Sequence, residues 1–434
     1  MFNIEPVTLR FILVSGIIVG LMIPLFLILV LVFERQDYYE DAVADVAQAW
    51  SDNQSFSGPM LLAETKTEVR TSTSEFKTET LVLMPIDLTL SLESSHEMRN
   101  RGIYRIPVFS ATVIATATFA PVAESSLPGE LQNAAIAVGI TDSRGVRSAT
   151  IHWNDDALEE QTSSQMGAIG NIVKTELSRS KLIEGGTVSV KVELRGTGRF
   201  SVLPVGDKTV VSMNSDWPHP SFDGRYLPDE REVTDSGFSA SWTTHALSRG
   251  FPAQLTVTEF DETISALRRN SRFSSDLGFS ILTLNTPYRA VERSIKYGIL
   301  FVVMTMIGII CIELVSRTQM HIVQYGVVGV GLVLFFLMVL SLSEHIGFGP
   351  GYAIAAAILA SMNTAYVWFA SRSPSVAVSV FSMLLVLYVA LYVVLQLNEY
   401  ALLVGSALLL ILLGALMYST RILRADSAEE TADT

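Results

Sequence analysis

Cysteine is almost absent from this 434-residue chain, because Cys311 is the only one. A single thiol excludes a disulfide within the chain, so an exported part must be held together by its apolar core. Basic residues are also scarce, since 30 Lys and Arg face 43 Asp and Glu. Nucleic-acid binding needs clustered Lys and Arg that replace counterions on the phosphates, so no nucleic-acid partner is expected.

Motifs that identify common catalytic and cofactor sites are missing as well. The chain has no G-x-S-x-G elbow, no Walker loop and no dinucleotide-binding glycine pattern. It also has no H-E-x-x-H or paired-Cys spacing for a metal. We therefore predict a protein without catalytic residues, metal or cofactor, and one that is not an enzyme.

Long apolar segments are what the chain has in excess, with 49% hydrophobic residues and a mean hydropathy of +0.40. A helix needs ~20 apolar residues to cross the hydrocarbon of a bilayer. Six segments come close to this length: 11–33, 299–315, 322–342, 351–370, 376–396 and 400–418. The first exceeds the ~7–15-residue apolar region of a cleaved signal peptide, so we interpret it as a retained anchor.

The apolar segments divide the chain into four predicted parts. We expect an N-terminal cytoplasmic end and anchor at 1–33, a soluble domain at 34–296, a five-helix transmembrane domain at 297–420 and an acidic tail at 421–434. The segment 34–296 contains 25 Lys and Arg against 35 Asp and Glu, which makes the soluble domain acidic.

Arginines in the short connections predict the orientation. Arg10, Arg317, Arg372, Arg421 and Arg424 all lie on one side if six spans alternate, and basic residues favour the cytoplasmic side. Both termini are then cytoplasmic and the soluble domain is periplasmic. We expect a multi-pass protein of a bacterial inner membrane, with the lipid bilayer and an unidentified envelope component as partners. The oligomeric state stays open.

Alternation of apolar and polar residues predicts β-strands in the soluble domain. Three segments show it: Ile86 to Leu92, Phe109 to Phe119 and Val188 to Leu194. Short turns at 196–198 and 205–208 predict a three-stranded meander over 188–213, and a further strand is expected at 237–243. Around Met166 to Leu177 the pattern is weakly helical, and residues 120–185 could form an inserted subdomain. The predicted fold class is an α+β membrane protein with an N-terminal transmembrane helix, an antiparallel, sandwich-like periplasmic β-domain and a C-terminal bundle of five transmembrane helices.

Polar residues at the predicted outer ends of the spans form a candidate cluster. Its members are Glu344, His345, Glu399, Arg293 and Lys296. A carboxylate at a membrane boundary needs a partner or water, so Glu344 or Glu399 is expected to pair with Arg293 or Lys296. Solvated interfacial anchors, a structural latch and a proton relay all remain open for this cluster. Glu313, near the other end of its span, is expected to pair with Arg317.

The segment 216–252 is a candidate periplasmic loop that is rich in aromatic and imidazole side chains. Its candidate residues are Trp217, His219, Arg231, Trp242 and His245. Asp223 and Glu230 are also metal-ligand types, although the spacing matches no known scheme. Two further features stand out: Arg101 and Arg105 flank a turn and could meet an anion, and Asn363 lies within a span.

Several long segments resemble the CreD family of bacterial inner-membrane proteins. They include "ERQDYYEDAV", "RGIYRIPVFSATV", "SDWPHPSFDGRYLPDERE", "PYRAVERSIKYGILF" and "SLSEHIGF". The resemblance implies one N-terminal span, a large periplasmic domain, a C-terminal group of spans, control by a two-component system and a role in envelope homeostasis. It implies no catalytic residues. Asn398 stands where the resemblance leads us to expect an acid.

Two main functions remain open at this point. The first is a non-enzymatic role in cell-envelope integrity or stress response, exerted through the periplasmic domain. The alternative is a transporter or channel, which needs a polar path through the spans. An enzyme acting on cell-wall material is a third possibility, and it would need His219 or His245 beside a carboxylate.

Overall fold

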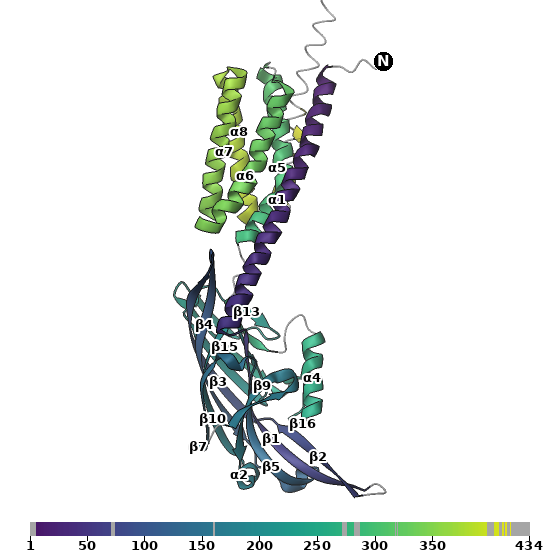
Figure 1. Cartoon of the computed structure of the whole chain (residues 1–434), viewed down its shortest axis with the longest axis vertical. Coiled ribbons are helices and arrows are strands. Elements are labelled where there is room, and N and C mark those ends of the chain that lie inside the picture. Colours follow the sequence, from purple (N-terminus) through teal and green to yellow (C-terminus); the bar gives the residue numbers. More distant parts are fainter. Residues whose placement is uncertain are drawn as a thin grey trace, which may run out of the picture. The chain divides into compact units, whose positions relative to one another are not determined.

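The computed structural model describes residues 6–70, 74–158, 161–270, 276–281, 287–316, 318, 320–396 and parts of 403–417. The chain divides into two compact units. The helical unit comprises Met1–Glu40 and Asn285–Thr434, and the sheet unit comprises Asp41–Leu284. Figure 1 shows the elements of both units.

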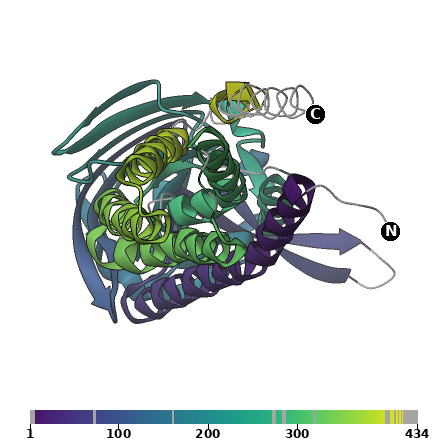
Figure 2. The ribbon, with the colours of Figure 1, turned by 90° about the horizontal axis from the view of Figure 1, so that it is seen from above.

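Five described helices are long and apolar enough to cross a membrane. They are α1 (Pro6–Trp50), α5 (Pro287–Ser316), α6 (Ile322–Ile346), α7 (Phe348–Ser371) and α8 (Pro374–Gln396). Within the helical unit, α5 packs on α6 and α8, and α7 packs on α6 and α8. Figure 2 looks down on this group, with α1 in purple along one side. Nine of the nineteen residues of the sixth predicted span, 400–418, lie outside the described residues.

Glycines allow the helices of this unit to approach one another closely. A Cβ atom on Gly298 would lie 2.8 Å from the ring of Phe336, and one on Gly329 would lie 2.4 Å from Leu21. Small residues have this function in membranes, where van der Waals packing has to replace the hydrophobic effect between helices. Gly331 of α6 similarly makes room for Asn363 of α7, because a Cβ atom on Gly331 would lie 2.5 Å from Asn363 Oδ1.

The sheet unit contains two β-sheets. Along sheet A the order is β13-β17-β11-β1-β5-β9-β8, with β2 beside β1 and β16 beside β2, and along sheet B it is β14-β15-β12-β3-β4-β10-β6-β7. The strands are β1 (Gln54–Arg70), β2 (Ser74–Leu83), β3 (Asp87–Arg101), β4 (Tyr104–Phe119), β5 (Glu130–Ile140), β6 (Val146–Trp153), β7 (Asp156–Leu158), β8 (Gln161–Met166), β9 (Gly170–Leu177), β10 (Gly186–Thr197), β11 (Arg199–Leu203), β12 (Lys208–Ser215), β13 (Ser221–Gly224), β14 (Glu230–Thr234), β15 (Gly237–His245), β16 (Gln254–Thr256) and β17 (Leu277–Ser280). Its helices are α2 (Arg179–Glu184), α3 (Ala246–Arg249) and α4 (Val257–Asn270).

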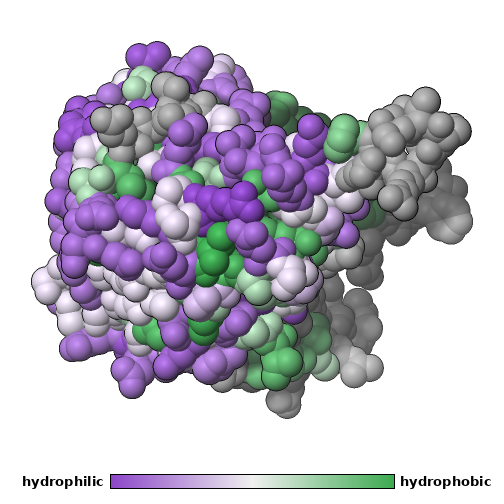
Figure 3. Space-filling model, turned by 90° about the horizontal axis from the view of Figure 1, so that it is seen from below, coloured by the Kyte–Doolittle hydropathy of each residue, from purple (hydrophilic) through white to green (hydrophobic). Residues whose placement is uncertain are grey.

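One apolar core contains side chains of both sheets. The predicted alternation is confirmed in β3, β4 and β10, whose inward residues include Leu90, Val113 and Val192, each 0% exposed. Ile86 precedes β3 and is 42% exposed, so the alternation starts two residues later than expected. The face of the sheet unit in Figure 3 is mostly hydrophilic, as expected for a unit with an internal core.

The predicted meander over 188–213 is wrong, because its three strands do not pair with one another. β10 and β12 belong to sheet B, whereas β11 between them belongs to sheet A. There β11 pairs in parallel with β1 and antiparallel with β17. Four consecutive residues of β11 are buried, which is typical of a strand covered on both faces and does not alternate. Short connections therefore carry the chain from one sheet to the other.

The weak helical pattern at 166–177 is also overruled. Gly170–Leu177 forms β9, which pairs with β5 over seven residue pairs. The helical parts nearby are a 3-10 turn at Gly167–Ile169 and the short helix Arg179–Glu184. Tertiary pairing outweighs a weak local preference here. Because β5, β8 and β9 lie in sheet A while β6 and β7 lie in sheet B, residues 120–185 are part of the two sheets and form no inserted subdomain.

Replacing Gly331 by Leu should lower the melting temperature of the detergent-purified protein. The new side chain would meet Asn363, and overpacking of this kind costs about 1–3 kcal/mol. Gly326→Leu on the same helix is the matched control, because a Cβ atom there meets nothing within 4 Å. Equal melting temperatures for the two variants would contradict the packing role of Gly331.

Candidate functional site

The carboxylate of Glu344 joins three helices of the helical unit. It lies in the last turn of α6, and its side chain is 9% exposed. The hydroxyl of Tyr288 on α5 donates to Glu344 Oε1 at 3.1 Å. Arg35 Nε on α1 lies 3.9 Å from the same oxygen. A hydroxyl and a guanidinium thus compensate the charge of a nearly buried carboxylate.

The partner of Glu344 differs from the predicted one. Among the described residues it contacts Arg35, which the sequence analysis did not include in the cluster. Lys296 pairs instead with Glu292, one turn earlier on α5, at 2.6 Å. Residues four apart share one face of a helix, so this local pair forms without any neighbouring helix.

The remaining members of the predicted cluster are His345, Arg293 and Glu399. His345 Nδ1 is 3.0 Å from the carbonyl oxygen of Ser341 on its own helix, and its side chain points to no described carboxylate. Arg293 is half-buried on α5. Glu399 lies outside the described residues. The structure therefore brings together Glu344, Tyr288 and Arg35 and does not show the predicted cluster as one site.

Glu313 stabilises the connection between α5 and α6. Its Oε1 atom accepts a hydrogen bond from the backbone N–H of Met320 at 2.7 Å, and its Oε2 atom accepts one from the hydroxyl of Tyr325. The predicted partner Arg317 lies outside the described residues. Because Glu313 is 8% exposed, these bonds satisfy a buried carboxyl group, and its role is structural.

Asn363 is the most deeply buried polar side chain within α7, at 4% exposure. Its carboxamide packs against Gly331, and its Nδ2 atom has no hydrogen-bond partner among the described residues. Asparagine often donates a hydrogen bond to a neighbouring helix in membrane proteins. Among the described residues, Asn363 Nδ2 makes no such bond.

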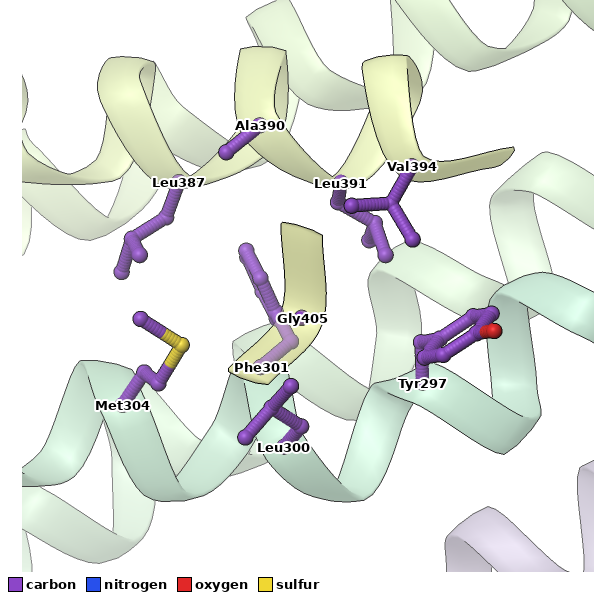
Figure 4. A pocket seen from close by; sticks show the side chains of 9 residues that line it. All are labelled: Tyr297, Leu300, Phe301, Met304, Leu387, Ala390, Leu391, Val394 and Gly405. Atoms are coloured by element: carbon purple, nitrogen blue, oxygen red, sulfur yellow. The ribbon is translucent and has the colours of Figure 1, made fainter. Parts of the chain in front are cut away.

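A cavity of about 20 Å³ lies between α5 and α8 (Figure 4). Its lining is almost wholly apolar: Tyr297, Leu300, Phe301, Met304, Leu387, Ala390, Leu391, Val394 and Gly405. Ligand pockets usually measure ~300–1,000 Å³ and contain convergent polar groups. A space of this size with this lining is a packing defect and no binding site for a solute.

The candidate residues of the segment 216–252 separate into core and surface. Trp217 and Trp242 are 4% and 1% exposed. His219, Arg231 and His245 are exposed, and none of these three pairs with a described residue of opposite charge. The structure therefore does not assemble these five residues into one site, and neither histidine lies beside a described carboxylate as an enzyme would require.

A contact that sequence reasoning missed involves His96 of β3. The Oδ1 atom of Asp216 lies 2.7 Å from His96 Nδ1 and accepts the His96 backbone N–H at 2.9 Å. The ring of His96 meets the edge of Trp217 at 4.9 Å between centroids. This contact fastens the start of the segment 216–252 to sheet B, and the 120 residues between His96 and Asp216 explain why no local pattern revealed it.

Asp223, considered above as a metal-ligand type, forms an ion pair with Arg199 in sheet A. Arg199 Nε is 3.1 Å from Asp223 Oδ1. Burial raises the pKa of Asp223, the charge of Arg199 opposes this, and the charge of nearby Asp276 adds to it. Ser201 donates to Asp276 at 3.1 Å. Within the described ranges no group of three or more His, Cys, Asp or Glu side chains could hold a metal ion.

The last turn of α1 is held by a hydrogen-bond network around Asp142, which lies between β5 and β6. Asp142 Oδ2 accepts from the Ser51 hydroxyl at 3.1 Å, the Asp52 N–H at 3.0 Å and Arg144 Nη2 at 2.8 Å. Arg144 Nη1 also donates to the carbonyl of Gln48 in α1 at 2.9 Å. Burial acts to raise the pKa of Asp142, but these hydrogen bonds outweigh it and lower the pKa to about 2.

Two sequence comparisons agree with one another over nearly the whole chain. The family model described as "Inner membrane protein CreD" matches residues 6–425. A curated relative, "Inner membrane protein CreD" of Escherichia coli (strain K12), is 29% identical over 422 residues, which cover 94% of this chain and 91% of the relative. Among solved structures, a two-domain M1 zinc metallopeptidase mutant bound to L-tryptophan aligns over 70% of this chain and 95% of its own at 9% identity. Its TM-score of 0.21 carries no argument.

The Asp142 network predicts a pH-dependent loss of stability in Asp142→Asn. Because the folded-state pKa of Asp142 is lowered to about 2 from 3.8, its contribution is present above pH 3.8 and is lost as the pH falls through 2. After discounting for solvent screening, we expect about 1–2 kcal/mol. Thermal melts of wild type and variant should differ at pH 6 and converge toward pH 2. A constant difference at all pH values would contradict the role of the charge.

Proposed function

This chain belongs to the CreD family of inner membrane proteins, and from that premise we propose that it supports cell-envelope integrity as a non-enzymatic protein. In this proposal the sheet unit lies in the periplasm and acts on another envelope component under stress. The helical unit supplies the attachment to the membrane.

The observation that carries the proposal is the continuity of α1. This helix runs from Pro6 to Trp50 without interruption, and it includes both the apolar segment and Gln48, whose carbonyl is bound by Arg144. The connection between the apolar segment and the sheet unit is therefore helical and is no Gly- or Ser-rich flexible linker. A helical connection is useful for holding a large folded unit at a membrane, and it is not needed for tethering a diffusing catalyst.

The fate of the chemically reactive side chains also supports a non-enzymatic role. Trp217 and Trp242 serve the core, Asp142 holds a helix end, and Glu313 and Glu344 satisfy contacts between helices. None of these contacts leaves a described carboxylate and histidine beside a cleft. The proposal therefore assigns the sheet unit to recognition and assigns no reaction to it.

The transporter alternative has weaker support. It needs a polar path through the spans, and the candidate residue in α7, Asn363, is buried within the bundle. The cavity between α5 and α8 is apolar. These observations favour a closed bundle, so we place the function in the sheet unit.

The proposed orientation can be tested with topology reporters. Alkaline phosphatase, which is active only in the periplasm, should be active when fused after residue 284 and inactive when fused after residue 318. Green fluorescent protein, which folds in the cytoplasm, should give the opposite pattern at the same two positions. Activity of the phosphatase at 318 but not at 284 would invert the proposed topology.

Deletion of the gene should make the host several-fold more sensitive to detergents and other envelope-active agents, and the wild-type gene should restore resistance. Arg231→Glu changes an exposed charge of the sheet unit, so we expect reduced restoration at unchanged protein level. Asn363→Leu is the contrasting variant, and it should restore resistance in full. Loss of restoration only with Asn363→Leu would favour the transporter, and an unaltered deletion strain would remove the proposed role.

A further inference from the structure

The β3–β4 hairpin extends well beyond the sheet that contains it. Its strands pair from Asp87 with Thr118 to Arg101 with Tyr104. The neighbouring strand β12 covers β3 only as far as Ser94, and β10 covers β4 only from Val108. Residues 95–107 therefore form a two-stranded ribbon with no further described strand on either side. We call this segment the ribbon.

The tip of the ribbon combines basic and apolar side chains. Residues 98–105 contain Arg99, Arg101 and Arg105 and no acidic residue. Met98 and Ile103 are 42% and 52% exposed. The sheet unit as a whole is acidic, so this tip is a local exception. Exposed apolar residues among arginines are typical of elements that bind the interface of an anionic membrane.

Two contacts with α1 give the direction of the ribbon. The guanidinium of Arg99 lies over the ring of Trp50, 4.3 Å from its centroid, and Arg101 Nη2 lies 2.9 Å from Asp45 Oδ2. From Arg99 to Arg101 the ribbon advances by two strand residues, or about 6.6 Å. From Trp50 back to Asp45, α1 covers five helical residues, or about 7.5 Å. The two lengths agree, so the ribbon and this part of α1 run side by side. The ribbon therefore runs antiparallel to the part of α1 that belongs to the sheet unit, from Trp50 toward Asp45. In the sequence, the apolar segment ends at Phe33, twelve positions before Asp45.

An open groove of about 450 Å³ separates the ribbon from the last turns of α1. Trp50, Arg99 and Arg101 contribute to its lining. A second guanidinium, that of Arg195, lies 4.1 Å from the Trp50 ring centroid. Tryptophan and arginine side chains both combine an apolar body with a polar group, as interfacial anchors do.

The arginines of the tip are available for an anion. Arg105 is exposed and has no ion pair with a described residue. The pairs of Arg99 with Glu97 and of Arg101 with Asp45 join side chains that are 47–62% exposed. Exposed pairs contribute only about 0–1 kcal/mol, whereas guanidinium groups bind phosphate oxygens with charge-assisted hydrogen bonds.

We propose that the tip of the ribbon binds the phosphate headgroups of anionic phospholipids in the membrane that α1 enters. Arg99, Arg101 and Arg105 contact the phosphates, and Ile103 reaches into the headgroup layer. The ribbon thereby gives the sheet unit a second attachment to the bilayer besides its covalent connections. This inference depends on the membrane location and does not depend on the proposed envelope role.

A spin label at position 103 tests the proposal in the full-length protein. Cys311→Ser removes the native thiol, and Ile103→Cys carries the label. Leu227→Cys is the matched control, because Leu227 is an exposed apolar residue of the same unit, at 68% exposure. In nanodiscs that contain phosphatidylglycerol, we expect the label at 103 to be several-fold less accessible to a water-soluble nickel chelate than the label at 227. Substitution of all three arginines by Gln should restore access at 103 and leave 227 unchanged.

Three outcomes would overturn the proposal. The first is equal access of the nickel chelate at both positions. The second is protection at 103 that persists both without anionic lipid and after the arginine substitutions. The third is release of the protection by inorganic phosphate at constant ionic strength, which would indicate a site for soluble anions. The melting temperature of the triple variant, which should stay within a few degrees of wild type, shows whether the unit is still folded.

Discussion

The network around Asp142 determines how the membrane-spanning helix enters the sheet unit. A helix end leaves several backbone groups without intrahelical partners, and here the carbonyl of Gln48 accepts from Arg144. The carboxylate of Asp142 accepts from Ser51 and Asp52, which lie in the connection from α1 to β1. Gln54, the first residue of β1, adds hydrogen bonds to the carbonyls of Asp142 and Arg195, one from each side of the sandwich. The helix end is thereby bound to both sheets through a few polar contacts.

The elements that were predictable are those whose pattern is local. α5 to α8 follow from apolar runs of sufficient length, and β3, β4 and β10 follow from strict alternation, since each has one face on the core. β11 and β9 could not be predicted in the same way. β11 is buried on both faces and therefore does not alternate, and β9 owes its strand conformation to β5, more than thirty residues earlier. Two parallel pairs, β1 with β11 and β12 with β3, likewise join strands far apart in the sequence.

The candidate sites show the same limit. Glu344 was recognised as a carboxylate that requires a partner, and the structure provides one, but its partner Arg35 lies more than three hundred residues earlier. Lys296, one of the two residues expected to pair with Glu344 or Glu399, pairs with Glu292 within its own helix. Residue type therefore indicated that a contact must exist, whereas the identity of the partner depended on the packing of α1, α5 and α6. In the same way, Trp217 was singled out for its residue type, but its neighbour His96 could not be named.

The packing of the helical unit also bears on what the protein can do. Gly298, Gly329 and Gly331 each receive a large side chain from another helix, and the rings of Phe301, Phe335 and Tyr388 lie 4.6–6.1 Å apart. A permeation path would need polar groups that face a space wide enough for water. Here the polar group of Asn363 faces a glycine of the next helix, and the cavity between α5 and α8 is small and apolar. Interdigitation of this kind leaves little polar space between the described helices.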